Sequence, residues 1–250
     1  MSLRVEAVGD AVVLTIEQPA TRNAIDRALA LRLADAIRLA AQDPQVRGIV
    51  ITGVGPTFLS GADLNMLAEL TRREGGGAEV LGMFDDLAVC ERCELPVVAA
   101  AQGDIFGGGC EFILLCDLVI LEEQAEIAFR HAKMGLSPAW GGMTRLVERV
   151  GPLSAGWLLF SGEKIGATEA LRIGLVNEVV ARGTARDRAL AKIARIADNP
   201  RTTVAAMKRT LREVREARRG AAMEREREVF SERWGGPDHQ QAMSAFLSKK

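Results

Sequence analysis

Residues 103–117 read GDIFGGGCEFILLCD, with three consecutive glycines between an expected strand and an expected helix. The strand is the fully apolar run Val97–Ala101, and the helical pattern starts after Gly109. The spacing matches neither G-x-x-x-x-G-K-[ST] nor G-x-G-x-x-G, so it does not indicate a phosphate-binding loop. Glycines at this point instead leave the backbone N–H groups of a helix N-terminus accessible to a ligand.

A second glycine-rich turn has the same placement. Residues 53–63, GVGPTFLSGAD, follow the apolar run Gly48–Thr52 and end in Asp63, a typical N-cap for the helical run Leu64–Leu70. If the two turns meet, their amides form a two-donor hole for an oxyanion such as a thioester enolate. Glycine turns that serve only packing look the same, so both interpretations stay open on this pattern alone.

Strands alternate with helices over the first 180 residues. A hairpin is predicted from Leu3–Ala7 and Ala11–Glu17 around the Gly9-Asp10 turn, and Asp26 precedes a helix. This alternation predicts an α/β fold whose apolar strands are covered on both faces. The other expected elements are a surface loop at Thr71–Ala78, a helix from Val80 to Cys93, and strands at Leu118–Leu121 and Leu175–Val180.

The C-terminal part is helical and rich in charge. The segment Arg201–Arg233 contains REVREARR and ERERE. We expect a solvated pair of helices with i,i+3 and i,i+4 ion pairs, because interspersed glutamates cancel the field that a nucleic-acid patch would need. Helices appended to an α/β core often make subunit contacts. The predicted organisation is therefore a catalytic core of residues 1–195 and a helical oligomerisation region of residues 196–250.

Composition and charge exclude several classes of protein. Of the 250 residues, 48% are hydrophobic, and 32 Lys and Arg against 33 Asp and Glu leave a net charge of −1. This balance gives no overall attraction for nucleic acid or an anionic membrane. No apolar run is long enough for a membrane span, and MSLRVEAVGD lacks the apolar core of a secretory signal. We expect a cytoplasmic protein.

Few residues in the chain are suited to metal binding or redox chemistry. The chain has two histidines and no tyrosine, so a site with two imidazole ligands would need both histidines. Cys90 and Cys93 form a C-x-x-C pair, which also fits a zinc or thioredoxin-like motif. The helical spacing around this pair and the lack of a second C-x-x-C favour reduced structural thiols. We expect no metal.

Six motifs, in order, resemble the enoyl-CoA hydratase/isomerase (crotonase) superfamily over nearly the whole chain. They are Arg22-Asn23-Ala24, Thr52–Leu64, Pro96–Gly103, Gly107–Asp117, Met134–Leu146 and Ala170–Val180, and the ending AFLSKK also fits. The resemblance implies a ClpP-like spiral of ββα units that assembles into trimers or dimers of trimers. It also implies an acyl-CoA thioester substrate, which carries its own coenzyme A, so no separate cofactor is expected.

The resemblance also implies roles for particular residues. The backbone N–H groups of Ala62 and Gly108 would form the oxyanion hole, and Glu111 stands where hydratases place the first of two water-handling glutamates. The second position, four residues before Gly135, holds His131. The residues expected to line the coenzyme A and acyl site are Arg22, Ala24, Ala62, Asp63, Leu64, Asn65, Gly108, Pro138, Trp140, Phe246 and Lys249.

The histidine changes the chemistry that we expect. Two carboxylates around a water support hydration, whereas a histidine can donate a proton or, as a cation, hold a substrate carboxylate. The stretches Phe129–Gly142 and Trp234–Pro237 look most like the ethylmalonyl-/methylmalonyl-CoA decarboxylase branch. In that interpretation Trp140 and Trp234 are apolar walls of the acyl pocket.

We therefore expect an acyl-CoA lyase that decarboxylates a short 2-alkylmalonyl-CoA through a thioester enolate. Ala62 and Gly108 would hold the oxyanion, while His131 and Glu111 manage the carboxylate and the proton. The alternative is enoyl-CoA hydration or isomerisation with Glu111 as acid and base. A remote alternative, suggested by the arginine-rich tail, is a non-catalytic RNA-binding protein with this fold.

Overall fold

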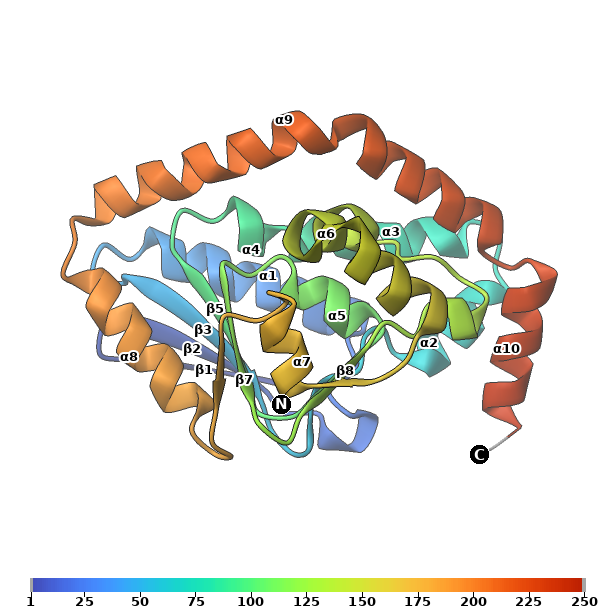
Figure 1. Ribbon diagram of the computed structural model, residues 1–250, viewed down its shortest axis with the longest axis horizontal. Coiled ribbons are helices and arrows are strands. Elements are labelled where there is room, and N and C mark those ends of the chain that lie inside the picture. Colours follow the sequence, from blue (N-terminus) through green and yellow to red (C-terminus); the bar gives the residue numbers. More distant parts are fainter. Residues whose placement is uncertain (1, 249–250) are drawn as a thin grey trace.

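The computed structural model describes residues 2–248, and its strands form two sheets (Figure 1). The larger sheet has the order β1-β2-β3-β5-β7-β10, with β1 antiparallel to β2 and every other pair parallel. Its strands are β1 Leu3–Val8, β2 Ala11–Ile16, β3 Gly48–Gly53, β5 Val97–Ala101, β7 Leu118–Glu122 and β10 Glu178–Val180. The smaller sheet has the order β4-β6-β8-β9, from Thr57–Leu59, Asp104–Phe106, Glu126–Ala128 and Ile165–Gly166.

Helices cover the larger sheet on both faces, which explains why its strands are apolar throughout. Val50 and Val98 pack with α8 (Ala185–Ala197) on one face. Ile49 and Ile51 face the main core, which includes α1 (Arg27–Gln42). Because successive side chains of a strand point to opposite faces, both sets must be hydrophobic. The prediction of an α/β fold is confirmed.

The two sheets are connected as repeated ββα units, which is the expected spiral. The chain passes from β3 to β4 and α2 (Leu64–Thr71), from β5 to β6 and α5 (Gly108–Ile113), and from β7 to β8 and the short helix η2 (Ala132–Met134). Strands β4, β6 and β8 are parallel neighbours, so the segments that follow them lie side by side. Ala62, Gly108 and His131 each come just after one of these strands.

Several predicted boundaries are wrong. The helix expected from Val80 to Cys93 is two helices, α3 (Gly76–Leu87) and α4 (Val89–Arg92). The expected loop Thr71–Ala78 is shorter, because α2 includes Thr71 and α3 already begins at Gly76. The last strand starts at Glu178 rather than Leu175. The remaining helices are η1 Pro19–Thr21, α6 Gly142–Ser161 with a kink at Gly151, α7 Ala167–Arg172, and α10 Pro237–Leu247.

The prediction of a pair of solvated helices in the tail is also wrong. Residues Arg201–Arg233 form one helix of 33 residues, α9, which crosses α3, α4 and α6 along one side of the molecule (Figure 1). Lys208, Arg219 and Glu226 of this helix are buried and bond to the core. Local spacing could not predict these partners, because they lie far away in the sequence. The boundary at residue 195 and the oligomerisation role of residues 196–250 stay predictions.

The four cysteines are free and buried in the core. Burial raises the pKa of Cys90 well above its usual value and raises that of Cys116 to about 12. Across residues 2–248, no group of three or more His, Cys, Asp or Glu side chains is placed to hold a metal ion. In the same range, no helix is both long and apolar enough to span a bilayer.

Candidate active site

The two glycine-rich turns, between which the sequence pattern alone left packing and catalytic interpretations open, meet in the structure. Gly61 has a φ of +92° and packs against Gly108 so closely that a methyl group on Gly61 would lie 2.6 Å from the Gly108 nitrogen. Ile25 pairs with this turn, since its N–H donates to the Gly61 carbonyl at 2.7 Å and its carbonyl accepts from Asp63 N–H at 3.0 Å. The Ala62 N–H lies between these two bonds and points away from Ile25.

Both candidate oxyanion donors are left without a partner. Among residues 2–248, neither Ala62 N–H nor Gly108 N–H donates a hydrogen bond. Gly108 is the first residue of α5 after Gly107, so its amide is one of the N–H groups that a helix cannot satisfy internally. Two neighbouring amides of this kind can bind an oxyanion.

Asn23, quoted above only as part of a motif, holds the glycine-rich turn of residues 53–63 in place. Its side chain is fully buried, and its Nδ2 donates to the carbonyls of Val54 at 2.9 Å and Thr57 at 2.7 Å. Its Oδ1 accepts from Gln18 N–H at 2.9 Å. These bonds tie the turn before Ile25 to the loop between β3 and β4. Sequence reasoning missed this role, although Asn is among the residue types enriched at positive φ, which Asn23 adopts here (φ +54°).

Glu111 lies one helical turn after Gly108 and is enclosed by backbone amides. Its Oε2 accepts from Trp140 N–H at 2.7 Å and Gly142 N–H at 3.1 Å, and its Oε1 accepts from Ala139 N–H at 3.4 Å. The side chain is only 3% exposed. Gly142 starts α6, so the carboxylate also lies at the positive end of a helix dipole.

His131 supplies the fourth contact to this carboxylate. Its Nε2 lies 2.9 Å from Glu111 Oε1. Since the three amides can only donate to Glu111, we assign the proton to Nε2, and the carboxylate then has about four acceptor positions in use. The Nδ1 atom of His131 is buried and has no hydrogen-bond partner among residues 2–248. Within the pair, this ring nitrogen is therefore free to contact a ligand, whereas the Glu111 oxygens are already bonded.

Trp140 connects the carboxylate to the oxyanion turn. Its backbone N–H bonds Glu111, its ring packs on Gly108, and its Nε1 donates to the Val80 carbonyl at 3.0 Å. A methyl group on Gly108 would lie 3.0 Å from the ring. Trp140 thus lies beside Gly108 and Glu111, and its role as an acyl-pocket wall stays a prediction. The Trp234 ring lies 4.8 Å from that of His239 and also packs on α3, where a methyl group on Gly77 would lie 3.0 Å from it; its role as a pocket wall stays a prediction.

The remaining predicted residues lie at positions 22–24, 63–65 and 138 and at the C-terminus. Asp63 caps α2, because its side chain accepts from Asn65 N–H and Met66 N–H at 2.9 Å each. Lys249 lies outside the described residues. Arg22 and Asn65 are exposed, Leu64 and Phe246 are half-buried, and Ala24 and Pro138 are buried. Coenzyme A contacts for these residues stay predictions.

Fold and site together define an enzyme of the crotonase type, with two free amides beside a buried carboxylate. The sequence profile of the enoyl-CoA hydratase/isomerase family matches residues 7–250, and the chain belongs to this family.

Similar proteins with different activities are found within this family. The chain is 33% identical to ethylmalonyl-CoA decarboxylase of Rattus norvegicus over 235 residues, covering 93% of this chain and 79% of the relative. It is 32% identical to 2,3-dehydroadipyl-CoA hydratase of Escherichia coli (strain K12) over 244 residues, covering 96% and 92%. The crystal structure of carnitinyl-CoA hydratase from Mycobacterium avium has a TM-score of 0.87 at 34% identity, covering 100% of this chain and 96% of that one.

Proposed function

We propose that the enzyme decarboxylates a short 2-alkylmalonyl-CoA, such as ethylmalonyl-CoA or methylmalonyl-CoA. The observation that carries the proposal is the His131–Glu111 contact at 2.9 Å, with Nδ1 of the same ring buried and without a partner in the described part of the chain. A protonated imidazole at this position attracts a substrate carboxylate, whereas a second glutamate would repel it. The similarity to an ethylmalonyl-CoA decarboxylase supports the same reaction.

In the proposed reaction, the thioester oxygen accepts hydrogen bonds from Ala62 N–H and Gly108 N–H. The bond between the α-carbon and the carboxylate breaks, carbon dioxide leaves, and the electron pair moves into the thioester to give an enolate. The two amides stabilise the new negative charge by a few kcal/mol for each donor. In its cationic form His131 carries a second proton, on Nδ1, and it delivers this proton to the α-carbon, which yields the saturated acyl-CoA and leaves a neutral imidazole with its proton on Nε2. Glu111 holds the imidazole in orientation and balances its charge.

The alternative function is hydration or isomerisation of an enoyl-CoA. The similarity to a hydratase supports this alternative. In that reaction Glu111 would have to orient or deprotonate a water. Its oxygens already accept from three backbone amides and contact His131. A water would therefore need one of these contacts to open first, which makes this reaction the second candidate.

A direct competition between substrates tests the proposal. The enzyme is mixed with ethylmalonyl-CoA and crotonyl-CoA, and butyryl-CoA and 3-hydroxybutyryl-CoA are quantified over time. We expect butyryl-CoA to form from ethylmalonyl-CoA. Formation of 3-hydroxybutyryl-CoA with ethylmalonyl-CoA left unchanged would overturn the proposal in favour of the hydratase.

We also propose that the enzyme works as a homo-oligomer, a trimer or a dimer of trimers. Large apolar side chains of α6 are exposed in the single chain, with Leu153 at 90%, Trp157 at 60% and Phe160 at 83%. Such a patch is typical of an interface. Sedimentation equilibrium is expected to give the mass of three or six chains, and a monomer at micromolar concentration would refute this.

The RNA-binding alternative finds little support in the charges of α9. Arg225 pairs with Glu228 and Glu232, and Arg227 pairs with Asp85. Paired arginines present a weaker field to a polyanion than a run of free ones. Salt-dependent retention of RNA by a Glu111→Gln variant, without turnover of any acyl-CoA, would instead favour this alternative.

A further inference from the structure

Glu226 is a second buried carboxylate close to the site, and it comes from α9. Its side chain is 2% exposed. Its Oε1 accepts from Met143 N–H at 3.1 Å, and its Oε2 accepts from Thr144 N–H at 3.1 Å and Thr144 Oγ1 at 2.9 Å. The glutamate is separated from these partners by more than eighty residues of chain. It therefore caps α6 from another part of the fold.

Glu226 and Glu111 accept hydrogen bonds from successive backbone amides at the N-terminus of α6. The amide of Gly142 donates to Glu111 Oε2 at 3.1 Å, and the next two amides, of Met143 and Thr144, donate to Glu226. These are N–H groups that a helix cannot satisfy internally, and they carry its positive dipole end. The first turn of α6 is thus fixed by two carboxylates at once.

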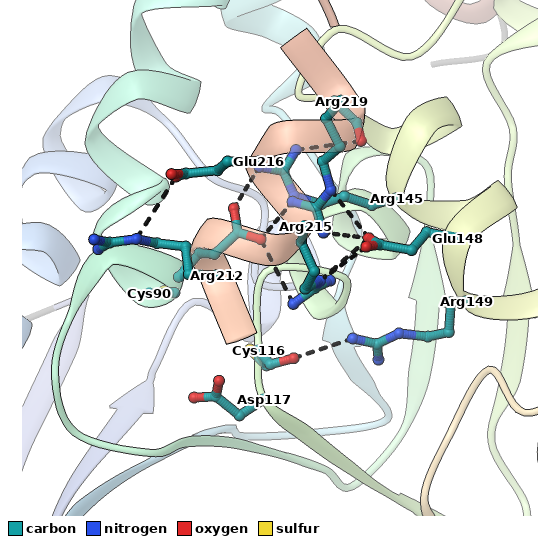
Figure 2. A network of polar contacts seen from close by, with 12 residues as sticks. Cys90, Cys116, Asp117, Arg145, Glu148, Arg149, Arg212, Arg215, Glu216 and Arg219 are labelled. Atoms are coloured by element: carbon teal, nitrogen blue, oxygen red, sulfur yellow. Dashed lines mark hydrogen bonds and ion pairs between the residues drawn. The ribbon is translucent and has the colours of Figure 1, made fainter. Parts of the chain in front are cut away.

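Arg145 of α6 bonds the loop just before this turn, and Glu91 links Arg145 to α9. Arg145 Nη1 donates to the carbonyls of Trp140 at 3.4 Å and Gly141 at 3.3 Å, and its Nη2 bonds Glu91 at 2.5 Å. Glu91 in turn accepts from Arg219 of α9 at 2.6 Å. Figure 2 shows Arg145, Arg219 and Glu148 converging at this crossing of α6 and α9. Trp140 and Gly142 are the residues whose amides bind Glu111 most closely.

We infer that Glu226 is a positioning residue for Glu111, acting through the first turn of α6. The inference rests on the proposed role of Glu111 and His131, and adds a group from the C-terminal helix to it. Without the cap, Met143 and Thr144 lose three bonds, and the direction of the preceding Gly142 amide is less firmly fixed. The Glu111 carboxylate then turns, and the His131 ring that it holds turns with it.

A matched pair of variants separates positioning from stability. Glu226→Gln weakens the cap of α6, while Lys208→Met removes another buried polar tie between α9 and the core. Lys208 Nζ bonds the carbonyls of Cys90 and Leu95 at 3.0 and 2.8 Å and Asp117 at 2.6 Å, away from the start of α6. Thermal midpoint, kcat and KM are measured for both.

We expect Glu226→Gln to lower kcat at least about tenfold with KM within about twofold. Lys208→Met should lower the thermal midpoint but keep kcat within about twofold. Thr144→Val removes only one of the three bonds and should lower kcat in the same direction by less. If Glu226→Gln lowers kcat no more than Lys208→Met at a comparable loss of stability, Glu226 is a structural cap only and the inference fails.

Nuclear magnetic resonance of the histidine rings tests the same inference without turnover. The chain has only two histidines, His131 and His239, so their ring nitrogen signals are simple to assign. Glu226→Gln and Thr144→Val are expected to shift the His131 signals, and Lys208→Met is expected to leave them in place. Unchanged His131 signals in a folded Glu226→Gln protein would overturn the inference. The result stands even if ethylmalonyl-CoA is not the substrate.

Discussion

His131 and Glu111 meet through one contact, Nε2 to Oε1 at 2.9 Å, and the other ring nitrogen of His131 remains buried and unpaired among residues 2–248. In the proposed mechanism, this nitrogen faces the substrate carboxylate and carries the proton that is transferred. Glu111, in contrast, has its acceptor positions in use. We therefore propose that the Glu111 carboxylate orients the imidazole and that the imidazole reacts with the substrate.

The first prediction concerns His131 itself. His131→Gln is expected to lower kcat for decarboxylation by about 10²–10⁴, because the proton donor and the partner of the substrate carboxylate are lost. His239→Gln is the control, since His239 is also buried but lies at the start of α10. The variants are compared by initial rates of butyryl-CoA formation. Equal rates for both would remove His131 from the mechanism.

The second prediction concerns the close contact between Gly142 and Glu111. A methyl group on Gly142 would lie 2.5 Å from Glu111 Oε2, so Gly142→Ala must displace the carboxylate. We expect a loss of kcat of about 10² or more, together with a lower thermal midpoint. Gly220→Ala in α9 is the control, because nothing lies within 4 Å of its added methyl group. That control should be stabilised by about 0.5–1 kcal/mol.

The third prediction concerns the oxyanion hole. A methyl group on Gly61 would lie 2.6 Å from the Gly108 nitrogen and would strain a backbone with φ of +92°. Gly61→Ala is therefore expected to push the two turns apart and to lower kcat/KM by about 10²–10³. Steady-state kinetics on a folded variant, checked by circular dichroism, measure this. A variant with unchanged kcat/KM would show that the two amides need not converge.

The fourth prediction is a pH dependence of stability. Burial opposes the ionisation of Glu91, but hydrogen bonds and charges from Arg145 and Arg219 outweigh it and lower its pKa from 4.5 to about 2. A lowered pKa means that Glu91 stabilises the fold above its unfolded value of 4.5, and that this contribution is lost as the pH falls toward about 2. Denaturant unfolding should give a larger free energy of unfolding for the wild type than for Glu91→Gln at neutral pH, and this difference should narrow in acid. A difference independent of pH would contradict the assignment.

The fifth prediction concerns the thiols. Because burial raises the pKa of Cys90, Cys93, Cys110 and Cys116, the thiolate form is scarce at neutral pH. All four cysteines should react with a disulfide reagent only after unfolding. Rapid labelling of the folded protein, followed spectrophotometrically, would show that a thiol is exposed.

The sequence is informative wherever the signal is local. Asp26 and Asp63 precede helices and do cap them. The apolar runs at Val97–Ala101 and Leu118–Leu121 lie in strands, and the glycines of both turns lie where the chain approaches itself. The family motif also placed His131 opposite Glu111, a pairing that no local pattern contains.

The long-range contacts could not be predicted in this way. Glu111 receives its amides from residues 28–31 positions further along the chain, and the α6 amides bonded by Glu226 lie 82–83 positions before it. Within α9, Glu226 looks like any other glutamate of an alternating charged helix. Only the packing of α9 across α6 distinguishes the buried charges from the solvated ones, which is why the tail was predicted as fully exposed.

A crystal structure with an unreactive ethylmalonyl-CoA analogue tests the central claim most directly. We predict a thioester oxygen within hydrogen-bond distance, about 2.7–3.2 Å, of both Ala62 N and Gly108 N. The carboxylate of the analogue should face His131 Nδ1. A thioester oxygen bound elsewhere, or a carboxylate directed away from His131, would contradict the account.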